Sequence, residues 1–285
     1  MLDNPAPRRA FELPLRAVRA IQSALGDLGE QVSFYGRAVA WAPRVVHRYR
    51  KEILRLLAEV SMGRGAVALV AGTVGIIICE TVAVGAVVGM VGYQGLRQIG
   101  ITSYVGFLSA YFNTREVAPL VASNALIATV GAGFTAQLGA MRISEEIDAL
   151  EVMAIPSVPF LVTTRLIASL LAVVPLYVIA LLGSYLATQA VSVFFYGMTN
   201  GTYQHYFTLF LPAIDIFYSF LKVIIFTVMI SLICCYYGFH ATRGPAGVGV
   251  AVGRAVRLGI VVTVGADFLL SLALWGSTTT VRLAG

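Results

Sequence analysis

Long apolar stretches separated by short charged segments dominate the pattern of this chain. Each stretch exceeds 20 residues and holds at most one charged side chain. The stretches cover residues 66–94, 117–141, 166–214, 216–239 and 258–281. About 20 apolar residues cross the hydrocarbon core of a bilayer as a helix, and none of these stretches shows the two-residue alternation of a barrel strand. The pattern therefore predicts an all-α integral membrane protein with five transmembrane helices, near residues 66–93, 102–140, 163–193, 214–238 and 258–277.

Composition supports the membrane class. Only 12% of the 285 residues are charged and 58% are hydrophobic, whereas a soluble domain carries about 25% charged residues. A soluble fold would leave large apolar patches exposed to water, which soluble proteins avoid.

Three regions are expected along the chain: a polar N-terminal tail (1–31), a basic amphipathic helix (32–62) and a transmembrane domain (63–285).

The region 32–62 has the pattern of a helix that lies flat in the membrane interface. Its cations follow a 4-3-4 spacing, which places them on one helix face. They are Arg44, Arg48, Lys51 and Arg55. The opposite face is apolar and holds Val46, Tyr49, Ile53, Leu56, Leu57 and Val60. We therefore expect the helix to turn its cations toward anionic headgroups. An ordinary soluble helix packed on the rest of the chain is the alternative.

The distribution of positive charge predicts the orientation of the helices. Eleven of the 20 Lys and Arg residues precede Gly65. With five helices and a cytoplasmic N-terminus, about 16 of these cations fall on the cytoplasmic side and two on the outside. Cytoplasmic loops of membrane proteins are enriched in Lys and Arg. The chain is therefore predicted to place its N-terminus inside and its C-terminus outside.

Three local features refine this topology. The second helix is unusually long, so we expect it to protrude into the cytoplasm or to break near Pro119. The segment Tyr196–Tyr203 is rich in turn-forming residues and is expected to be an external loop. Gly85 and Gly89 have the GxxxG spacing of close helix–helix contacts in membranes.

A cluster of carboxylates stands out in the loop between the second and third helices. Ser144 is expected to cap a short cytoplasmic helix whose acids share one face and whose apolar residues share the other. The acids are Glu145, Glu146, Asp148 and Glu151, with Glu146 at the edge of the apolar face, which holds Ile147, Leu150 and Met153. The helix either docks into a protein partner or is a solvated loop helix tucked under the spans.

The ionisable residues singled out as candidates within the predicted spans are Arg115, Glu116, Glu80 and Asp267. Intramembrane charges are costly and point to function by default. For Arg115 and Glu116, gating beside a transport pathway and the locking of neighbouring helices are both open. Glu80 and Asp267 are interpreted as helix-packing partners, and Lys222 is expected to snorkel to the outer surface.

An enzymatic role is not supported by the residue inventory. The two lysines, Lys51 and Lys222, follow no glycine-rich loop, so a Walker A phosphate loop is excluded. The sequence contains no HExxH, no GxSxG and no His–Cys metal pattern. We expect a non-catalytic chain that binds no metal and no nucleic acid.

Two blocks of sequence carry a family resemblance. The first joins Arg115-Glu116-x-x-Pro119 to residues 136–153, AQLGAMRISEEIDALEVM. The second is residues 238–255, GFHATRGPAGVGVAVGRA, followed by Asp267-Phe268 in the final helix. These blocks resemble the MlaE/YrbE-type permeases, which are membrane subunits of ABC transporters that work with MCE-domain lipid-binding proteins. The resemblance covers about residues 35–277, and 238–255 corresponds to the family's last cytoplasmic loop.

The resemblance implies a transport function. The helix 144–153 would be the coupling helix that inserts into a cytoplasmic ABC ATPase, and that ATPase would bind ATP and Mg in place of this chain. Periplasmic MCE-domain proteins are the implied partners, and fatty acids, phospholipids or sterols are the implied cargo. The implied location is the bacterial plasma (inner) membrane. A proton-coupled carrier of hydrophobic substrates and a passive membrane scaffold are the alternatives.

Two departures from the family pattern point to a second permease. The usual Ala-Gly-Arg-x-Gly-Ser-Ala stretch is here ATVGAGF, residues 128–134, and lacks the arginine. The usual Ala-Glu-Leu-Gly has Gln137 in place of the glutamate. We hypothesise that this subunit pairs with a non-identical permease that retains both charges, as in an actinobacterial Mce system.

Overall fold

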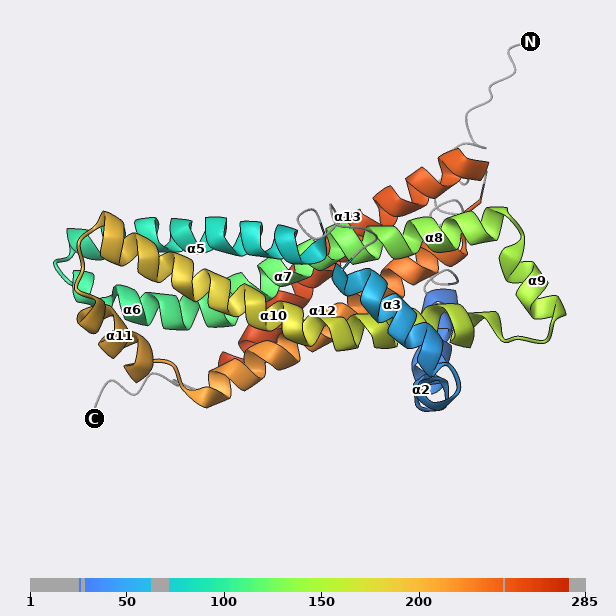
Figure 1. Cartoon of the computed structure of the whole chain (residues 1–285), viewed down its shortest axis with the longest axis horizontal. Coiled ribbons are helices and arrows are strands. Elements are labelled where there is room, and N and C mark those ends of the chain that lie inside the picture. Colours follow the sequence, from blue (N-terminus) through green and yellow to red (C-terminus); the bar gives the residue numbers. More distant parts are fainter. Residues whose placement is uncertain (1–25, 27–28, 63–71, 243, 277–285) are drawn as a thin grey trace, which may run out of the picture.

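The computed structural model describes residues 26, 29–62, 72–242 and 244–276, which form helices joined by short turns (Figure 1). No strand occurs among these residues, as predicted for the all-α class. Five stretches are long and apolar enough to cross a membrane: Thr73–Gln98, Thr102–Ile143, Pro159–Phe195, Ala213–Phe239 and Gly244–Trp275. The predicted number of spans is therefore confirmed, and the middle three match their predicted bounds within a few residues.

Each span is one helix or a series of joined helical segments. The first span is α5 (Thr73–Gln98), the fourth is α12 (Ala213–Phe239) and the fifth is α13 (Gly244–Trp275). The second comprises η1 (Thr102–Tyr104), α6 (Val105–Leu108), η2 (Ser109–Val117), α7 (Ala118–Leu126), η3 (Ile127–Gly131) and α8 (Ala132–Ile143). The third comprises η4 (Pro159–Thr163), α10 (Thr164–Ala190) and η5 (Val191–Phe195).

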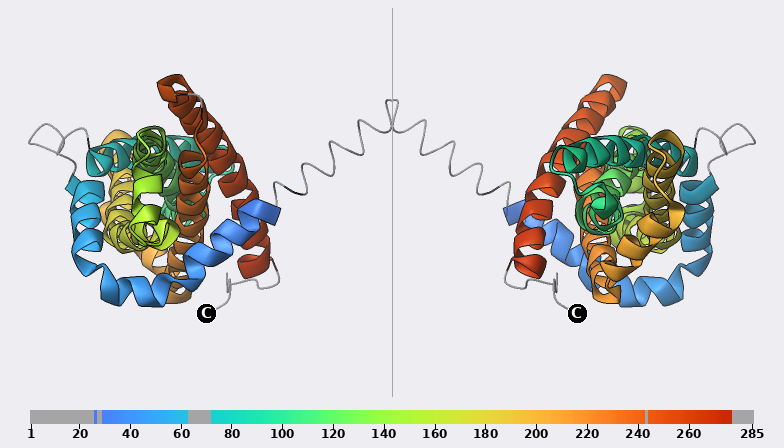
Figure 2. Two further views of the ribbon diagram at one scale, coloured as in Figure 1. Left: turned by 90° about the vertical axis from the view of Figure 1, so that its right-hand side faces the viewer. Right: turned by 90° about the vertical axis from the view of Figure 1, so that its left-hand side faces the viewer.

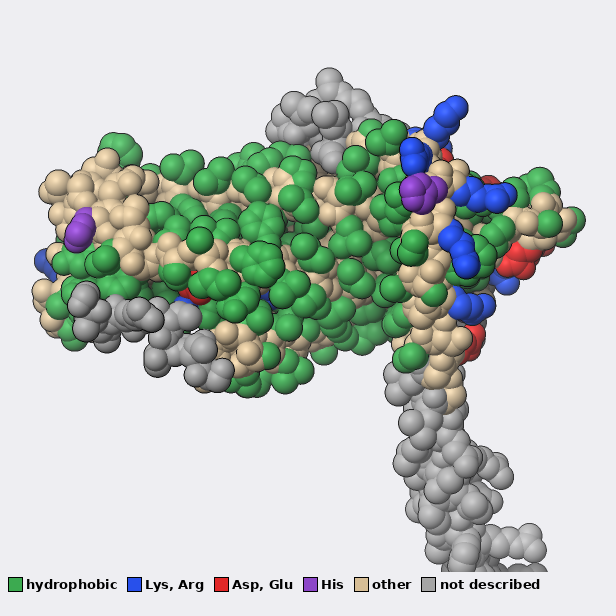
Figure 3. Space-filling model, turned by 90° about the horizontal axis from the view of Figure 1, so that it is seen from below, with side chains coloured by type: hydrophobic (Ala, Val, Ile, Leu, Met, Phe, Trp, Pro, Cys, Tyr) green, Lys and Arg blue, Asp and Glu red, His purple; other side chains and the backbone are tan. Residues whose placement is uncertain are grey.

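Shorter helices lie at the two ends of the bundle (Figure 1). A helix over residues 29–40, α2 (Ala42–Arg48) and α3 (Arg50–Met62) lie toward the end that carries α9 (Glu146–Val152). At the opposite end, α11 (Asn200–Leu209) connects the third and fourth spans. Figure 2 shows the same helices viewed down the long axis of the bundle from each end. Lys and Arg gather at the α9 end, beyond a broad apolar belt (Figure 3).

The N-terminal region is not the single helix predicted for 32–62. It breaks at Trp41 and again at Tyr49, whose backbone leaves the helical region with φ −118° and ψ 34°. Pro43 in the first turn of α2 explains the first break, because proline lacks an N–H and is tolerated only at a helix start. The prediction of a polar tail falls mainly outside the described residues, and residues 29–31 are helical.

The breaks change which side chains turn inward. Val45 is buried and Val46 is 41% exposed, although the expected apolar face contained Val46. Val45, Ile53 and Leu56 pack against Ala168 of α10. The four predicted interface cations, Arg44, Arg48, Lys51 and Arg55, are all exposed. Their contact with headgroups stays a prediction.

The long second span does not break at Pro119. Its helix is continuous, and the wide turns of η2 end directly before α7, in whose first turn the proline lies. A proline leaves the carbonyl four residues earlier without its helical donor, and here Lys222 donates to that carbonyl, the oxygen of Arg115, at 2.7 Å. The 42-residue span is roughly 60 Å long at 1.5 Å per residue, about twice the hydrocarbon thickness, so it is long enough to protrude from the bilayer. Its protrusion into the cytoplasm stays a prediction.

Two other boundaries were predicted incorrectly. The fifth span begins at Gly244 and not near residue 258, so most of the block 238–255 is helix and not loop. Pro245 does not prevent this, because the first helical residues have no intrahelical acceptor for their N–H groups. The expected external loop is helical from Asn200 onward, where α11 begins.

Close contact between the first and third spans depends on small residues. A Cβ added to Gly85 would lie 2.6 Å from the carbonyl oxygen of Ser184, so only glycine fits there. The approach lets Thr188 Oγ1 donate a 2.8 Å hydrogen bond to the Gly85 carbonyl. The predicted GxxxG contact is confirmed, with α10 as the neighbouring helix.

Candidate functional site

A network of charged side chains is buried between the second, fourth and fifth spans. Arg115 and Glu116 come from η2, Asp215 and Lys222 from α12, and Asp267, Ser271 and Trp275 from α13. Asp215 and Lys222 are seven positions apart, and the three residues of α13 recur every four positions, so each of these two sets lies on one helix face. The network lies toward the α11 end, because Asp215 is in the first turn of α12 and Trp275 ends α13.

Lys222 is the centre of the network. Its side chain is fully buried, and its Nζ lies 2.6 Å from Asp267 Oδ1 and 3.3 Å from Glu116 Oε2. It donates to Ser271 Oγ at 2.8 Å, and Ser271 in turn donates to Glu116 Oε1 at 2.7 Å. The contact with Asp267 is an ion pair outside hydrogen-bond geometry. The expectation that Lys222 would snorkel to the surface is wrong, because its acceptors surround it inside the bundle.

A second ion pair joins the second and fourth spans. Arg115 donates to Asp215 Oδ2 from Nε at 3.0 Å and from Nη2 at 2.7 Å, and both side chains are buried. The guanidinium lies 4.0 Å from the ring centre of Tyr111 and 5.0 Å from that of Trp275, within the range of cation–π attraction. Trp275 Nε1 donates to Asp215 Oδ1 at 2.9 Å.

Sequence reasoning named three of the five charged members of this network and missed the other two. Arg115, Glu116 and Asp267 were candidates; the acid Asp215 was not singled out, and Lys222 was assigned to the surface. One signal could have found both, because Asp215 and Lys222 are seven positions apart and therefore share a helix face. Arg115 and Glu116 form ion pairs with two different residues of α12, Asp215 and Lys222 respectively.

Glu80 does not join the network. It lies on α5, half-buried, and its Oε2 atom has no hydrogen-bond partner among the described residues. The structure therefore gives no contact that supports its interpretation as a helix-packing partner.

The acidic helix α9 forms a projection at the opposite end of the bundle (Figure 1). Ser144 was predicted to cap this helix, and that prediction is wrong. The Ser144 hydroxyl instead lies 3.0 Å from Ala140 O and 3.0 Å from Glu146 Oε1. Glu145 precedes the helix with φ 61°, in the left-handed region. This residue turns the chain sharply between α8 and α9.

The side chains of α9 divide into an anchored and an exposed set. Ile147 is fully buried, and Arg142 of α8 binds Asp148 at 2.6 Å. Glu151 accepts a 2.6 Å hydrogen bond from Ser157. Met153 was expected on the buried apolar face but is 61% exposed, because α9 ends at Val152 and Met153 lies beyond the helix. Val152 itself is 89% exposed.

The position where this chain departs from the family pattern makes contacts of its own. Gln137 donates to Glu59 of α3 at 2.8 Å and accepts from Arg165 of α10 at 3.3 Å. A glutamate at 137 would place a second carboxylate beside Glu59. The described residues hold no group of three or more His, Cys, Asp or Glu side chains arranged for a metal.

Comparison with known proteins gives consistent matches. The permease MlaE family model matches residues 62–273. A probable ABC transporter permease protein of Rickettsia bellii is 31% identical over 176 residues, which are 60% of this chain and 66% of the relative. The chain thus spans slightly less than two thirds of that relative.

Two further relatives come from other lineages. Protein TRIGALACTOSYLDIACYLGLYCEROL 1, chloroplastic, of Arabidopsis thaliana is 32% identical over 61% of this chain and 50% of the relative. The intermembrane phospholipid transport system permease protein MlaE of Haemophilus influenzae is 25% identical over 71% of this chain and 78% of its own length.

Proposed function

Because this chain belongs to the MlaE permease family, we propose that it is the membrane-spanning subunit of an ATP-driven lipid transporter. It is a multi-pass protein of the inner membrane, with five helices able to span the bilayer. The names of its relatives as ABC transporter permeases support the ATP-driven class, and the name of the Haemophilus relative supports phospholipid as cargo. Fatty acids and sterols, which are also largely apolar, are the alternative cargo within this proposal.

The exposed helix α9 is the observation that carries this proposal. It projects from the bundle, its tip exposes Val152 and Met153, and the carboxylates of Glu145 and Glu146 are also exposed. An exposed apolar tip with charges around it has the character of a protein interface. Arg142 and the buried Ile147 tie α9 to the second span, so a push on α9 would reach the bundle. We propose that α9 is the coupling helix.

The remaining subunits follow from this assignment. A cytoplasmic ABC ATPase would receive α9 and bind ATP and Mg, and the chain would have its N-terminus inside, in agreement with the cations at the α9 end (Figure 3). Periplasmic MCE-domain proteins would exchange lipid at the α11 end. The departures at residues 128–137 favour a second, non-identical permease.

We propose that the buried network holds the second, fourth and fifth spans together in this transporter. Lys222 and Arg115 connect the second, fourth and fifth spans through five polar partners. Breaking one member of a buried ion pair costs about 3–5 kcal/mol. The three spans are therefore expected to move as one body when α9 is displaced.

A proton-coupled carrier is the second candidate, and the network is the observation that favours it. Within the described residues it holds two cations and three carboxylates, so one carboxylate has no counter-charge. A carrier of this kind would move lipid under a pH gradient without an ATPase. Reconstitution of the isolated chain in vesicles with a pH gradient separates the two functions, because the proposed permease would show no uptake.

Purification of the complex tests the ATPase contact. The double variant Glu145→Lys/Glu146→Lys reverses the charge of the exposed end of α9 and should abolish co-purification of an ATPase. Glu52→Lys, a reversal on α3 away from α9, is the control and should retain it. Equal retention by both variants would refute the coupling role of α9. Mass spectrometry of the purified subunits would reveal whether a second permease is present.

A further inference from the structure

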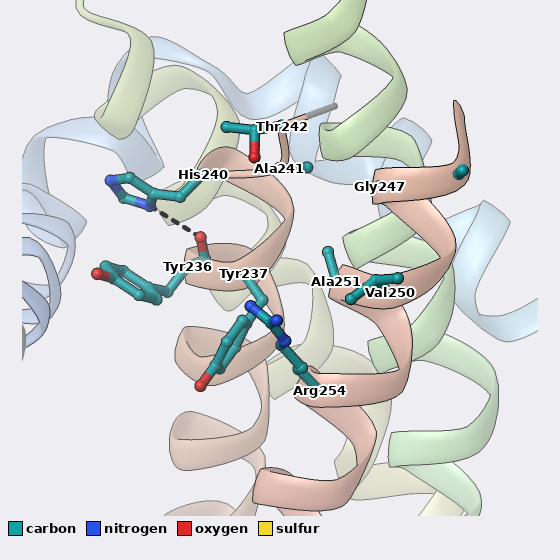
Figure 4. A pocket seen from close by; sticks show the side chains of 10 residues that line it. Tyr236, Tyr237, His240, Ala241, Thr242, Gly247, Val250, Ala251 and Arg254 are labelled. Atoms are coloured by element: carbon teal, nitrogen blue, oxygen red, sulfur yellow. Dashed lines mark hydrogen bonds between the residues drawn. The ribbon is translucent and has the colours of Figure 1, made fainter. Parts of the chain in front are cut away.

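A cavity of about 430 Å³ opens between the end of α12 and the beginning of α13. Figure 4 shows its walls, with Tyr236, Tyr237, His240 and Thr242 on one side and Gly247, Val250, Ala251 and Arg254 on the other. It lies toward the α9 end of the bundle, remote from the buried network. Neither the coupling helix nor the network uses it.

The polar groups of the cavity are suited to an anion. No Asp or Glu is among its lining residues. Arg254 is exposed and makes no hydrogen bond or ion pair within the described part of the chain. Thr242 and Tyr237 bring hydroxyl groups to the same walls. A guanidinium has two parallel N–H donors that match the geometry of phosphate oxygens.

One carboxylate lies at the rim and is already engaged. Glu30 Oε1 is 3.6 Å from His240 Nε2, while the other ring nitrogen of His240 donates to Tyr236 O at 2.9 Å. Among the described residues, no carboxylate lines the Arg254 side of the cavity. A zwitterionic headgroup would find no carboxylate there for its ammonium group.

The depth of Arg254 corresponds to a membrane interface. At 1.5 Å per residue, Arg254 lies roughly 31 Å along α13 from Trp275, which is about the thickness of the hydrocarbon core. Trp275 is at the other end of the bundle, where tryptophan is typical of the interface. The cavity therefore lies at the level of the headgroups on the α9 side.

An apolar surface continues from the cavity into the hydrocarbon region. Arg254, Val261 and Phe268 are seven positions apart and share a face of α13. Val261 is 69% exposed and Phe268 is 65% exposed. A molecule with an anionic head in the cavity would have its acyl chains along this face.

We propose that this cavity binds the phosphate headgroup of an anionic phospholipid from the leaflet on the α9 side. Arg254 binds the phosphate oxygens beside Tyr237 of the facing wall, the glycerol and acyl chains follow α13 from Arg254 toward Val261, and the part of the headgroup beyond the phosphate occupies the space beside Val250. The site is separate from α9, so it does not depend on the coupling proposal. It would bind anionic lipid whether or not an ATPase is attached.

Native mass spectrometry of the full-length chain, purified with the subunits it retains, tests the site. After delipidation, phosphatidylglycerol is added in increasing amounts, with phosphatidylcholine and glycerol phosphate as separate arms. Arg254→Gln should weaken the binding of phosphatidylglycerol about ten-fold, the effect of one charge-assisted contact. The matched control is Arg257→Gln, which removes an exposed arginine on the same helix that donates to Gly253 O and lies outside the cavity. It should change the affinity by less than about two-fold.

A second variant keeps the charge and removes the space. Val250 is 53% exposed on the cavity wall, so Val250→Trp should fill the cavity without disturbing the core, and should also weaken binding. Equal loss for Arg254→Gln and Arg257→Gln would overturn the proposal, since it would mean only general attraction to a basic surface. Equal affinity for phosphatidylcholine, or full competition by glycerol phosphate, would overturn the assignment to an anionic lipid.

Discussion

Removal of the ammonium group at the centre of the buried network provides the sharpest test of its role. Lys222→Met keeps the length and apolar stem of the side chain but deletes the charge. Nζ of Lys222 is fully buried, 2.6 Å from Asp267, 3.3 Å from Glu116, and 2.7 Å from the carbonyl oxygen of Arg115. The variant leaves two carboxylates inside the bundle with no cation between them.

The structure sets the expected magnitude. Breaking a buried pair by removing one partner costs about 3–5 kcal/mol, because the remaining charge is buried without compensation. The variant also removes the hydrogen bond from Nζ to the Arg115 carbonyl, which adds to this cost. We expect Lys222→Met to lower the stability of the reconstituted protein by at least about 3 kcal/mol, as a clear fall in its thermal midpoint.

A double-mutant cycle separates charge from packing. Lys222→Met/Asp267→Asn removes the closest carboxylate as well and should recover about half of the loss, whereas independent effects would add. Lys51→Met is the matched control, because Lys51 is the other lysine of the chain and is exposed. Thermal unfolding in nanodiscs measures the unaltered protein, Lys222→Met, Asp267→Asn, the double variant and the Lys51→Met control. A loss below about 1 kcal/mol for Lys222→Met, or no recovery in the double variant, would refute the network as a lock.

Three further changes test separate parts of the structure by the same unfolding assay. Gly85→Leu should separate α5 from α10 and cost about 1–3 kcal/mol or more, because even a Cβ would lie 2.6 Å from Ser184 O; an unchanged midpoint would contradict this packing. Trp275→Phe should cost about 1.5–3 kcal/mol by removing the donor to Asp215, and no loss would mean that the bond does not form. Ala154→Gly should stabilise the end of α9 by up to about 1 kcal/mol, since Ala154 has φ 59°; destabilisation would contradict the left-handed conformation.

The membrane-spanning architecture could be predicted because it depends on local composition. Each span is a long apolar run, and a bilayer offers no partner for backbone groups except the helix itself. The middle spans were located within a few residues for this reason. The start of α13 was missed because its first residues, from Gly244, are rich in glycine and proline, which local rules assign to loops.

The partners of the buried charges could not be predicted in the same way. Sequence shows that Arg115 and Glu116 are adjacent, but adjacent positions on a helix point in different directions. In the structure, Arg115 forms an ion pair with Asp215, and Glu116 forms one with Lys222. Lys222 was assigned to the surface because a lone lysine in a span usually reaches water, and only the arrangement of three helices reveals its buried acceptors.

The sequence by itself determined that this protein spans a membrane five times, carries its positive charge at one end and has a short acidic helix in the loop after its second span. Those properties follow from hydrophobic length and from charge counted along the chain. Only the tertiary structure decided which faces of the helices meet, which residues of α9 stay exposed, and where Lys222 finds its acceptors. The physical reason is that a contact between distant helices depends on their tilt and rotation, which no local pattern specifies.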